Sequence, residues 1–102
     1  MKNIVLVCNM GMSTSALMKK MRSYAESINY ECTVNAYPVS ELGKVLDDAA
    51  VVLVGPQISY MLKKIEEIAK EKNVPVSTIP TQMYGFMDGK GAIELARKLM
   101  GE

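Results

Sequence analysis

The sequence predicts an α/β domain with a three-layer architecture: an open sheet of four parallel strands, in the order 2-1-3-4, with helices on both faces. Three observations support this prediction. Short apolar segments alternate with segments of helical period along the whole chain. Residues 4–7 and 50–54 are apolar at every position, as expected of strands covered on both faces. Right-handed crossovers then place these two strands at the centre of the sheet.

The first half of the chain predicts two strands with a helix between them. Residues 4–7 form the first strand, and residues 9–14 form a turn with hydroxyl side chains suited to capping a helix. An alternating segment at residues 32–37 is typical of an edge strand, which Pro38 ends. The intervening helix is predicted by apolar side chains at helical spacing, namely Leu17, Met21, Ala25 and Ile28.

The second half predicts two more strands and their helices. A short helical turn at residues 40–46 leads to the strand at 50–54, and Pro56 is well placed in the first turn of the next helix. That helix continues to about residue 70, and Asn73 suits its C-terminal end. Residues 74–79 form the fourth strand, residues 80–91 a loop with three glycines, and residues 92–100 the last helix. No linker or repeat is visible, so residues 1–102 are expected to form a single domain.

The composition excludes several classes of protein. Twelve Lys and Arg against eleven Asp and Glu leave a net charge of +1, without the basic surplus of a nucleic-acid binder. The chain has no histidine, which excludes Ser-His-Asp hydrolysis, Cys-His proteolysis and His-ligated zinc. Two cysteines are too few for a structural zinc site, and we expect neither a metal nor a cofactor. The longest apolar run, residues 49–54, is far below the ~18 residues of a membrane span, so we expect a cytosolic protein.

The predicted topology places one candidate site where the strand order reverses, between the carboxyl ends of the first and third strands. Cys8 ends the first strand there. The N-terminus of the following helix favours a thiolate, and its N–H groups can hold phosphoryl oxygens. Gly11 allows the loop to curl. The candidate phosphate-binding loop is Asn9, Met10, Gly11, Met12, Ser13, Thr14 and Ser15.

The position of Cys8 alone leaves a second interpretation open, a small buried side chain without chemistry. Cys32, in mid-strand, is expected to pack in the core. Met10 and Met12 favour a rim for a protein partner over an anchor for the loop. The cations Lys19, Lys20 and Arg22 favour a solvated helix face over a contact with an acidic partner. The other rim or partner-contact residues are Gly55, Pro56, Gln57, Ser59, Tyr60 and Tyr84, of which Tyr84 either shields a phosphate or packs as an ordinary aromatic side chain.

These motifs resemble a known family. The stretch from Cys8 to Ser15, with Gly55-Pro56-Gln57-Ile58, Tyr84-Gly85 and Asp88-Gly89, is similar to the enzyme IIB component of the bacterial sugar phosphotransferase system. The similarity is to its lactose/cellobiose (chitobiose) branch, with the cellobiose type nearest, and it covers essentially the whole chain.

The resemblance implies a phosphatase-like Cys loop in which Cys8 becomes a phosphocysteine. Cys8 would accept a phosphoryl group from a phosphohistidine of a IIA protein. It would then transfer the group to a β-linked disaccharide of the cellobiose, chitobiose or lactose type, bound by the IIC membrane transporter. The enzyme would be a protein-phosphohistidine–sugar phosphotransferase, a monomer in the cytoplasm associated with the inner face of the membrane through IIC.

Two other functions stay open from the residues. A low-molecular-weight tyrosine phosphatase has an Arg six positions after its Cys, followed by Ser or Thr, but here Thr14 occupies the Arg position. Asp88 suits either the general acid of such an enzyme or a helix N-cap. The other alternative is a non-catalytic docking or thiol-regulatory module with Cys8 as a redox handle. The residues favour the phosphotransferase, then the thiol module, then the phosphatase.

Overall fold

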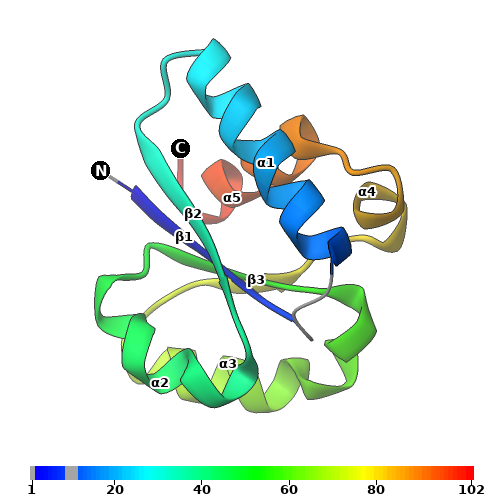
Figure 1. Cartoon of the computed structure of the whole chain (residues 1–102). Helices are drawn as coiled ribbons and strands as arrows, with labels where there is room; N and C mark the ends of the chain where they lie inside the picture. The colour runs from blue at the N-terminus through cyan, green and yellow to red at the C-terminus, as the bar shows by residue number, and fades with distance from the viewer. Residues whose placement is uncertain (1, 9–11) are drawn as a thin grey trace.

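A single sheet of four parallel strands lies at the centre of the fold. The computed structural model describes residues 2–8 and 12–102, with side chains from Thr14 onward in the second range. The strands are β1 (Lys2–Val7), β2 (Cys32–Tyr37), β3 (Val51–Val54) and β4 (Val76–Thr78). Their order is β2-β1-β3-β4, and all three pairings are parallel, which confirms the predicted topology (Figure 1).

Helices cover both faces of the sheet, as predicted (Figure 1). Buried side chains of α1, α4 and α5 pack with Leu6 and Leu53 on one face, and those of α2, η3 and α3 pack with Val5 and Val52 on the other. Because the central strands alternate between these two layers, residues 4–7 and 51–54 are all buried. The helices are α1 (Met12–Ser27), η1 (Val39–Glu41), α2 (Leu42–Val45), η2 (Leu46–Asp48), η3 (Pro56–Met61), α3 (Leu62–Lys70), α4 (Thr81–Gly85) and α5 (Gly89–Leu99).

The helix predicted from Pro56 to residue 70 is divided in two. Its first part, η3, is a tight 3-10 segment, and the backbone of Ile58 leaves helical geometry there, at φ −118° and ψ 25°. Ile58 is 1% exposed, and its N–H donates to the carbonyl of Gly55 over 3.1 Å. The chain therefore turns sharply at the end of β3 and buries this side chain before the regular helix α3 begins.

The loop predicted at residues 80–91 is wrong, because the segment contains α4 and the first turn of α5. The end of α4 is closed by Met87, whose φ of 53° is in the left-handed region. Asp88 N–H donates to the carbonyl of Met83 over 2.9 Å, and Met87 N–H donates to that of Tyr84 over 3.2 Å. These two bonds form a Schellman motif with methionine where glycine is usual.

Helix α5 begins at Gly89, three residues before the predicted start, because Gly89 is in contact with α1. A Cβ on Gly89 would lie 2.4 Å from the carbonyl carbon of Lys20, so only glycine allows this approach. Asp88 caps the helix: its Oδ1 accepts a hydrogen bond from the N–H of Gly91 over 2.8 Å. The predicted C-terminal role of Asn73 is confirmed by its φ of 56° just after α3.

Two predictions for single side chains are also wrong. Ile28 was expected on the apolar face of the first helix, but α1 ends at Ser27 and Ile28 is 39% exposed. Cys32 is the first residue of β2 and not in mid-strand. It is partly buried against the core under α1 and α5, and this burial raises the pKa of its thiol.

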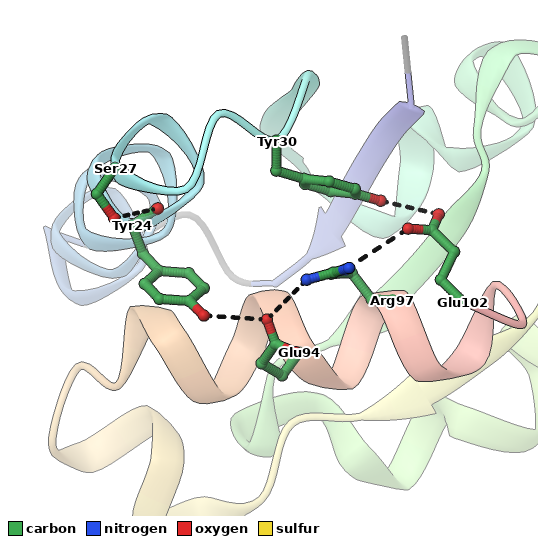
Figure 2. Close-up of polar contacts among 6 residues, drawn as sticks. All are labelled: Tyr24, Ser27, Tyr30, Glu94, Arg97 and Glu102. Atoms are coloured by element: carbon green, nitrogen blue, oxygen red, sulfur yellow. Dashed lines mark hydrogen bonds and ion pairs between the residues drawn. The ribbon is translucent and has the colours of Figure 1, made fainter.

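Polar contacts fasten the C-terminal end of the chain at the amino edge of the sheet (Figure 2). Glu94 Oε2 accepts hydrogen bonds from Tyr24 Oη over 3.1 Å and from Arg97 Nη1 over 3.2 Å. Glu102 accepts one from Tyr30 Oη over 2.9 Å, and its Oε1 lies 3.5 Å from Arg97 Nε. Burial, with this bond, raises the pKa of Tyr30 to about 12. In the part of the chain that the structure describes, no helix is both long and apolar enough to cross a membrane.

Candidate functional site

Cys8 lies directly after β1, between the carboxyl ends of β2 and β3. Its N–H donates to the carbonyl of Tyr37 over 3.2 Å, and Gly55 N–H donates to the carbonyl of Val7 over 2.9 Å. The parallel register that pairs Val7 with Val54 therefore places Gly55 beside Cys8. A Cβ on Gly55 would lie 3.4 Å from Cys8 Cβ, so glycine keeps this neighbourhood open. Cys8 is 3% exposed and lies at the base of this edge.

Helix α1 begins at Met12, four residues after Cys8. Asn9, Met10 and Gly11 lie outside the described residues, as do the side chains of Met12 and Ser13. The hypotheses for these side chains, including a methionine rim, are therefore not tested. The backbone nevertheless places the N-terminus of a 16-residue helix four residues after the thiol. Helix N-termini favour anions through their dipole and their unpaired N–H groups.

A buried hydrogen bond joins this end of α1 to α4. Thr14 Oγ1 and Tyr84 Oη are 2.8 Å apart, and either oxygen can donate. Thr14 is 2% exposed and Tyr84 is 7% exposed, with its ring in the core under α1 and α5. This observation supports the packed interpretation of Tyr84. Of the predicted loop hydroxyls, that of Thr14 faces the interior, whereas Ser15 is exposed.

Three of the predicted rim residues, Pro56, Gln57 and Tyr84, line one depression between η3 and α4. This pocket has a volume of about 330 Å³ and is lined by Pro56, Gln57, Thr81, Tyr84 and Gly85. Gln57 Oε1 lies 3.0 Å from the position of a Cβ on Gly55, so its side chain folds back toward Gly55. The structure thus brings Gly55, Pro56, Gln57 and Tyr84 together at the carboxyl edge of the sheet.

The groups that a tyrosine phosphatase would need are engaged elsewhere. The sequence has two arginines, Arg22 and Arg97. Arg22 donates from Nε and Nη2 to the carbonyl of Val34 in β2, and Arg97 belongs to the contacts of Figure 2. The carboxylate of Asp88, the candidate general acid, caps α5. These contacts disfavour a phosphatase, whose transition state relies on a guanidinium beside the thiolate.

The two cysteines lie at opposite ends of neighbouring strands. Cys32 pairs with Lys2, at the start of β1, whereas Cys8 follows the last residue of β1. At 3.3 Å per residue in a parallel strand, the two are separated by about 20 Å. This distance far exceeds the ~7 Å limit between Cα atoms of a disulfide. Cys32 therefore cannot act as the resolving thiol of a redox pair within this fold.

One exposed aromatic side chain near this edge was not among the predicted rim residues. Phe86 follows α4 directly and is 83% exposed. Residues 80–91 were predicted to form a loop, so no pattern in the sequence indicated the short helix α4, which presents Phe86 to solvent. Among the described residues, no group of three Cys, Asp or Glu side chains is arranged to hold a metal ion.

Comparisons with known proteins agree with this fold. Residues 3–95 match the family model described as the lactose/cellobiose-specific IIB subunit of the phosphotransferase system. A Bacillus subtilis protein, the oligo-β-mannoside-specific EIIB component, is 40% identical over 98% of this chain and 97% of its own length. The cellobiose-specific EIIB component of Lactococcus lactis is 32% identical over 97% of this chain and 96% of its own.

A solved structure is similar over nearly the whole chain. The cellobiose-specific phosphotransferase IIB component of Borrelia burgdorferi has a TM-score of 0.84 and 40% identity, over 98% of this chain and 92% of its own. Identity of 40% over nearly the full length of both chains shows that the two proteins share a family as well as a fold. The chain therefore belongs to the lactose/cellobiose-specific IIB subunits of the sugar phosphotransferase system.

Proposed function

We propose that Cys8 is the residue of this IIB subunit that carries the phosphoryl group. The observation that supports the proposal best is its position: a cysteine at the carboxyl end of β1, beside Gly55 and four residues before the N-terminus of α1. The chain contains no histidine, so a phosphohistidine in the relay has to come from a partner protein. That partner is a phosphorylated IIA protein.

In the first step, the Cys8 sulfur attacks the phosphorus of the donor's phosphohistidine. An S–P bond forms and the N–P bond breaks. The imidazole nitrogen keeps the electron pair of the broken bond and receives the proton that the thiol gives up. Such a transfer is loose, so the protein contributes mainly position and charge stabilisation. The N–H groups at the start of α1 hold the phosphoryl oxygens.

In the second step, a hydroxyl oxygen of the sugar attacks the phosphorus. The S–P bond breaks, the sulfur keeps the electron pair, and the hydroxyl proton returns to it. The acceptor is a β-linked disaccharide or oligosaccharide held by the IIC membrane subunit. Two relatives support this class of sugar, because they are described as specific for oligo-β-mannosides and for cellobiose.

The carrier function requires a phosphocysteine that water does not cleave quickly. A phosphatase would accelerate that cleavage with a guanidinium and a general acid, but both arginines and the Asp88 carboxylate make their contacts elsewhere. The distribution of these groups supports a carrier over a hydrolase. Phosphocysteine lifetime is accordingly the property that separates the two functions.

The test is intact-mass analysis after incubation with phosphoenolpyruvate, the upstream phosphotransferase proteins and a IIA protein. Wild type and Cys32→Ser are expected to gain one phosphoryl group, and Cys8→Ser none. The donors are then removed, and the rate at which the added mass is lost in buffer gives the lifetime of the phosphocysteine. Gain of the same mass by Cys8→Ser, or rapid release of inorganic phosphate from the wild type, would contradict the proposal.

A further inference from the structure

Charged residues are absent from the described parts of the chain that follow or end the strands at the carboxyl edge of the sheet. Four parts of the chain build this edge: Cys8 with residues 14–18, and residues 36–40, 54–62 and 77–87, which follow or end the four strands. None of the twelve Lys and Arg or the eleven Asp and Glu falls in them, although 23% of the sequence is charged. We refer to these four parts as the uncharged edge.

The opposite edge is different. Lys2 lies 3.9 Å from Glu102 there, and Lys72 lies 2.9 Å from Asp47. Both termini also lie on that side of the molecule in Figure 1. Charge is thus distributed unevenly between the two ends of the parallel strands, and the end that bears Cys8 is the neutral one.

Two large aromatic side chains project from the uncharged edge. Tyr60 of η3 is 80% exposed and Phe86, just after α4, is 83% exposed. The pocket of about 330 Å³ lies between the elements that carry them, η3 and α4. Phe86 is held in this position, because its N–H donates to the carbonyl of Gln82 over 3.0 Å and the Schellman motif follows it. Its exposure is therefore a property of the folded chain.

We infer that Tyr60 and Phe86 are the anchors by which this chain binds the phosphorylated IIA donor, across a contact without ion pairs. The inference rests on the proposed function, which requires the donor to cover the edge around Cys8. Interface centres are depleted of charge and enriched in aromatic side chains. The uncharged edge itself buries no charged group under a partner. Asp88 lines the depression beside Phe86, but its carboxylate keeps its hydrogen bond to the N–H of Gly91, so the desolvation cost is low.

The absence of charged residues from the uncharged edge also disfavours a membrane surface as the binding partner of Tyr60 and Phe86. The cytoplasmic surface of a membrane is negatively charged and attracts Lys and Arg. The uncharged edge offers none. A neutral, partly apolar surface of a protein is the complementary partner. Association with that surface should depend little on salt, whereas a contact through Lys19 and Lys20 of α1 would weaken strongly as salt screens it.

The experiment compares Phe86→Ala and Tyr60→Ala with Ile28→Ala. Ile28 is the matched control, since it is also an exposed apolar side chain, at 39%, but lies at the end of α1 remote from Cys8. The initial rate of phosphoryl transfer from the phosphorylated IIA protein is measured against its concentration. Onward transfer to sugar is measured separately, with prephosphorylated variants and membranes containing IIC. Circular dichroism verifies that each variant is folded.

Phe86→Ala and Tyr60→Ala are each expected to raise the KM for the donor about tenfold, with kcat unchanged and a smaller effect on the onward step. Ile28→Ala should match the wild type. Between about 0.1 M and 1 M salt, the wild-type KM should change less than about twofold. An unchanged KM in both aromatic variants, a defect confined to the onward step, or a strong salt dependence would overturn the inference. A wild type that accepts no phosphoryl group would instead contradict the proposed function.

Discussion

Replacement of Tyr84 by phenylalanine removes one oxygen atom from the interior beneath the candidate site. The lost hydroxyl is the partner of Thr14, 2.8 Å away and 70 residues distant in sequence. The aromatic ring, 7% exposed, keeps its packing in the core. The substitution therefore isolates the connection between the first turn of α1 and α4.

The expected cost follows from the burial of the partner that remains. Thr14 is 2% exposed, so its hydroxyl cannot find water as a substitute. A buried polar group that loses its partner costs about 1–3 kcal/mol. The threonine hydroxyl can rotate toward another acceptor, which places the loss in the lower part of this range, at about 1–2 kcal/mol.

The assay is urea unfolding of Tyr84→Phe, Thr14→Val and the double variant. Each single variant should lower the free energy of unfolding, and the double variant should lose less than the sum, by about 1 kcal/mol. Tyr60→Phe is the control, because the same hydroxyl is removed from a side chain that is 80% exposed. It should change the stability by less than about 0.5 kcal/mol. Strictly additive losses, or a Tyr84→Phe variant as stable as Tyr60→Phe, would show that the bond between Thr14 and Tyr84 contributes nothing to stability.

Three further predictions concern the parts of the fold that hold the site in place. Gly89→Ala places a Cβ 2.4 Å from backbone of Lys20, so we expect thermal unfolding to show a loss of about 1–3 kcal/mol or more. Asp88→Ala removes the N-cap bond to Gly91, and chemical denaturation should show a loss of about 1 kcal/mol, most of which Asp88→Asn restores. The pKa of Tyr30 is raised from 10.0 to about 12 by burial, so the fold favours the neutral phenol. Its contribution to stability is complete below pH 10, is lost as the pH rises toward 12, and should disappear from the pH profile of Tyr30→Phe.

The sheet could be predicted because its central strands are apolar at every position. A segment such as residues 51–54, buried at 0% exposure throughout, has no polar face to confuse its assignment. Once β1 and β3 are adjacent, the chain following each strand has to meet at the same edge. The neighbourhood of Cys8 and Gly55 therefore follows from sequence pattern and topology together.

The segment around α4 could not be predicted, for two physical reasons. A helix of five residues completes little more than one turn, so it shows no periodicity in its apolar side chains. Its end is marked by Met87 in the left-handed region, where the usual sequence signal is glycine or asparagine. At Gly89 the situation is reversed, because a glycine stands inside a helix. Its low helix propensity indicates a loop, but the close packing of α5 against Lys20 of α1 requires a residue without a Cβ.

The pair formed by Thr14 and Tyr84 was beyond prediction for a different reason. Each residue was a candidate for the site, but nothing local relates two positions 70 residues apart. Their contact depends on how α4 packs under α1, and α4 itself was missing from the expected elements. Side-chain partnerships across such distances follow from tertiary packing and not from any pattern along the chain.

NMR of protein labelled with ¹³C at the cysteine Cβ atoms shows directly whether the sulfur of Cys8 carries the phosphoryl group. The two cysteines give two signals, and Cys32, about 20 Å away by strand geometry, is an internal control. After phosphorylation by the donor, the Cβ signal of Cys8 should shift and split through coupling to ³¹P, while that of Cys32 stays unchanged. A protein that gains the mass of one phosphoryl group but keeps an unsplit Cys8 signal would contradict the account.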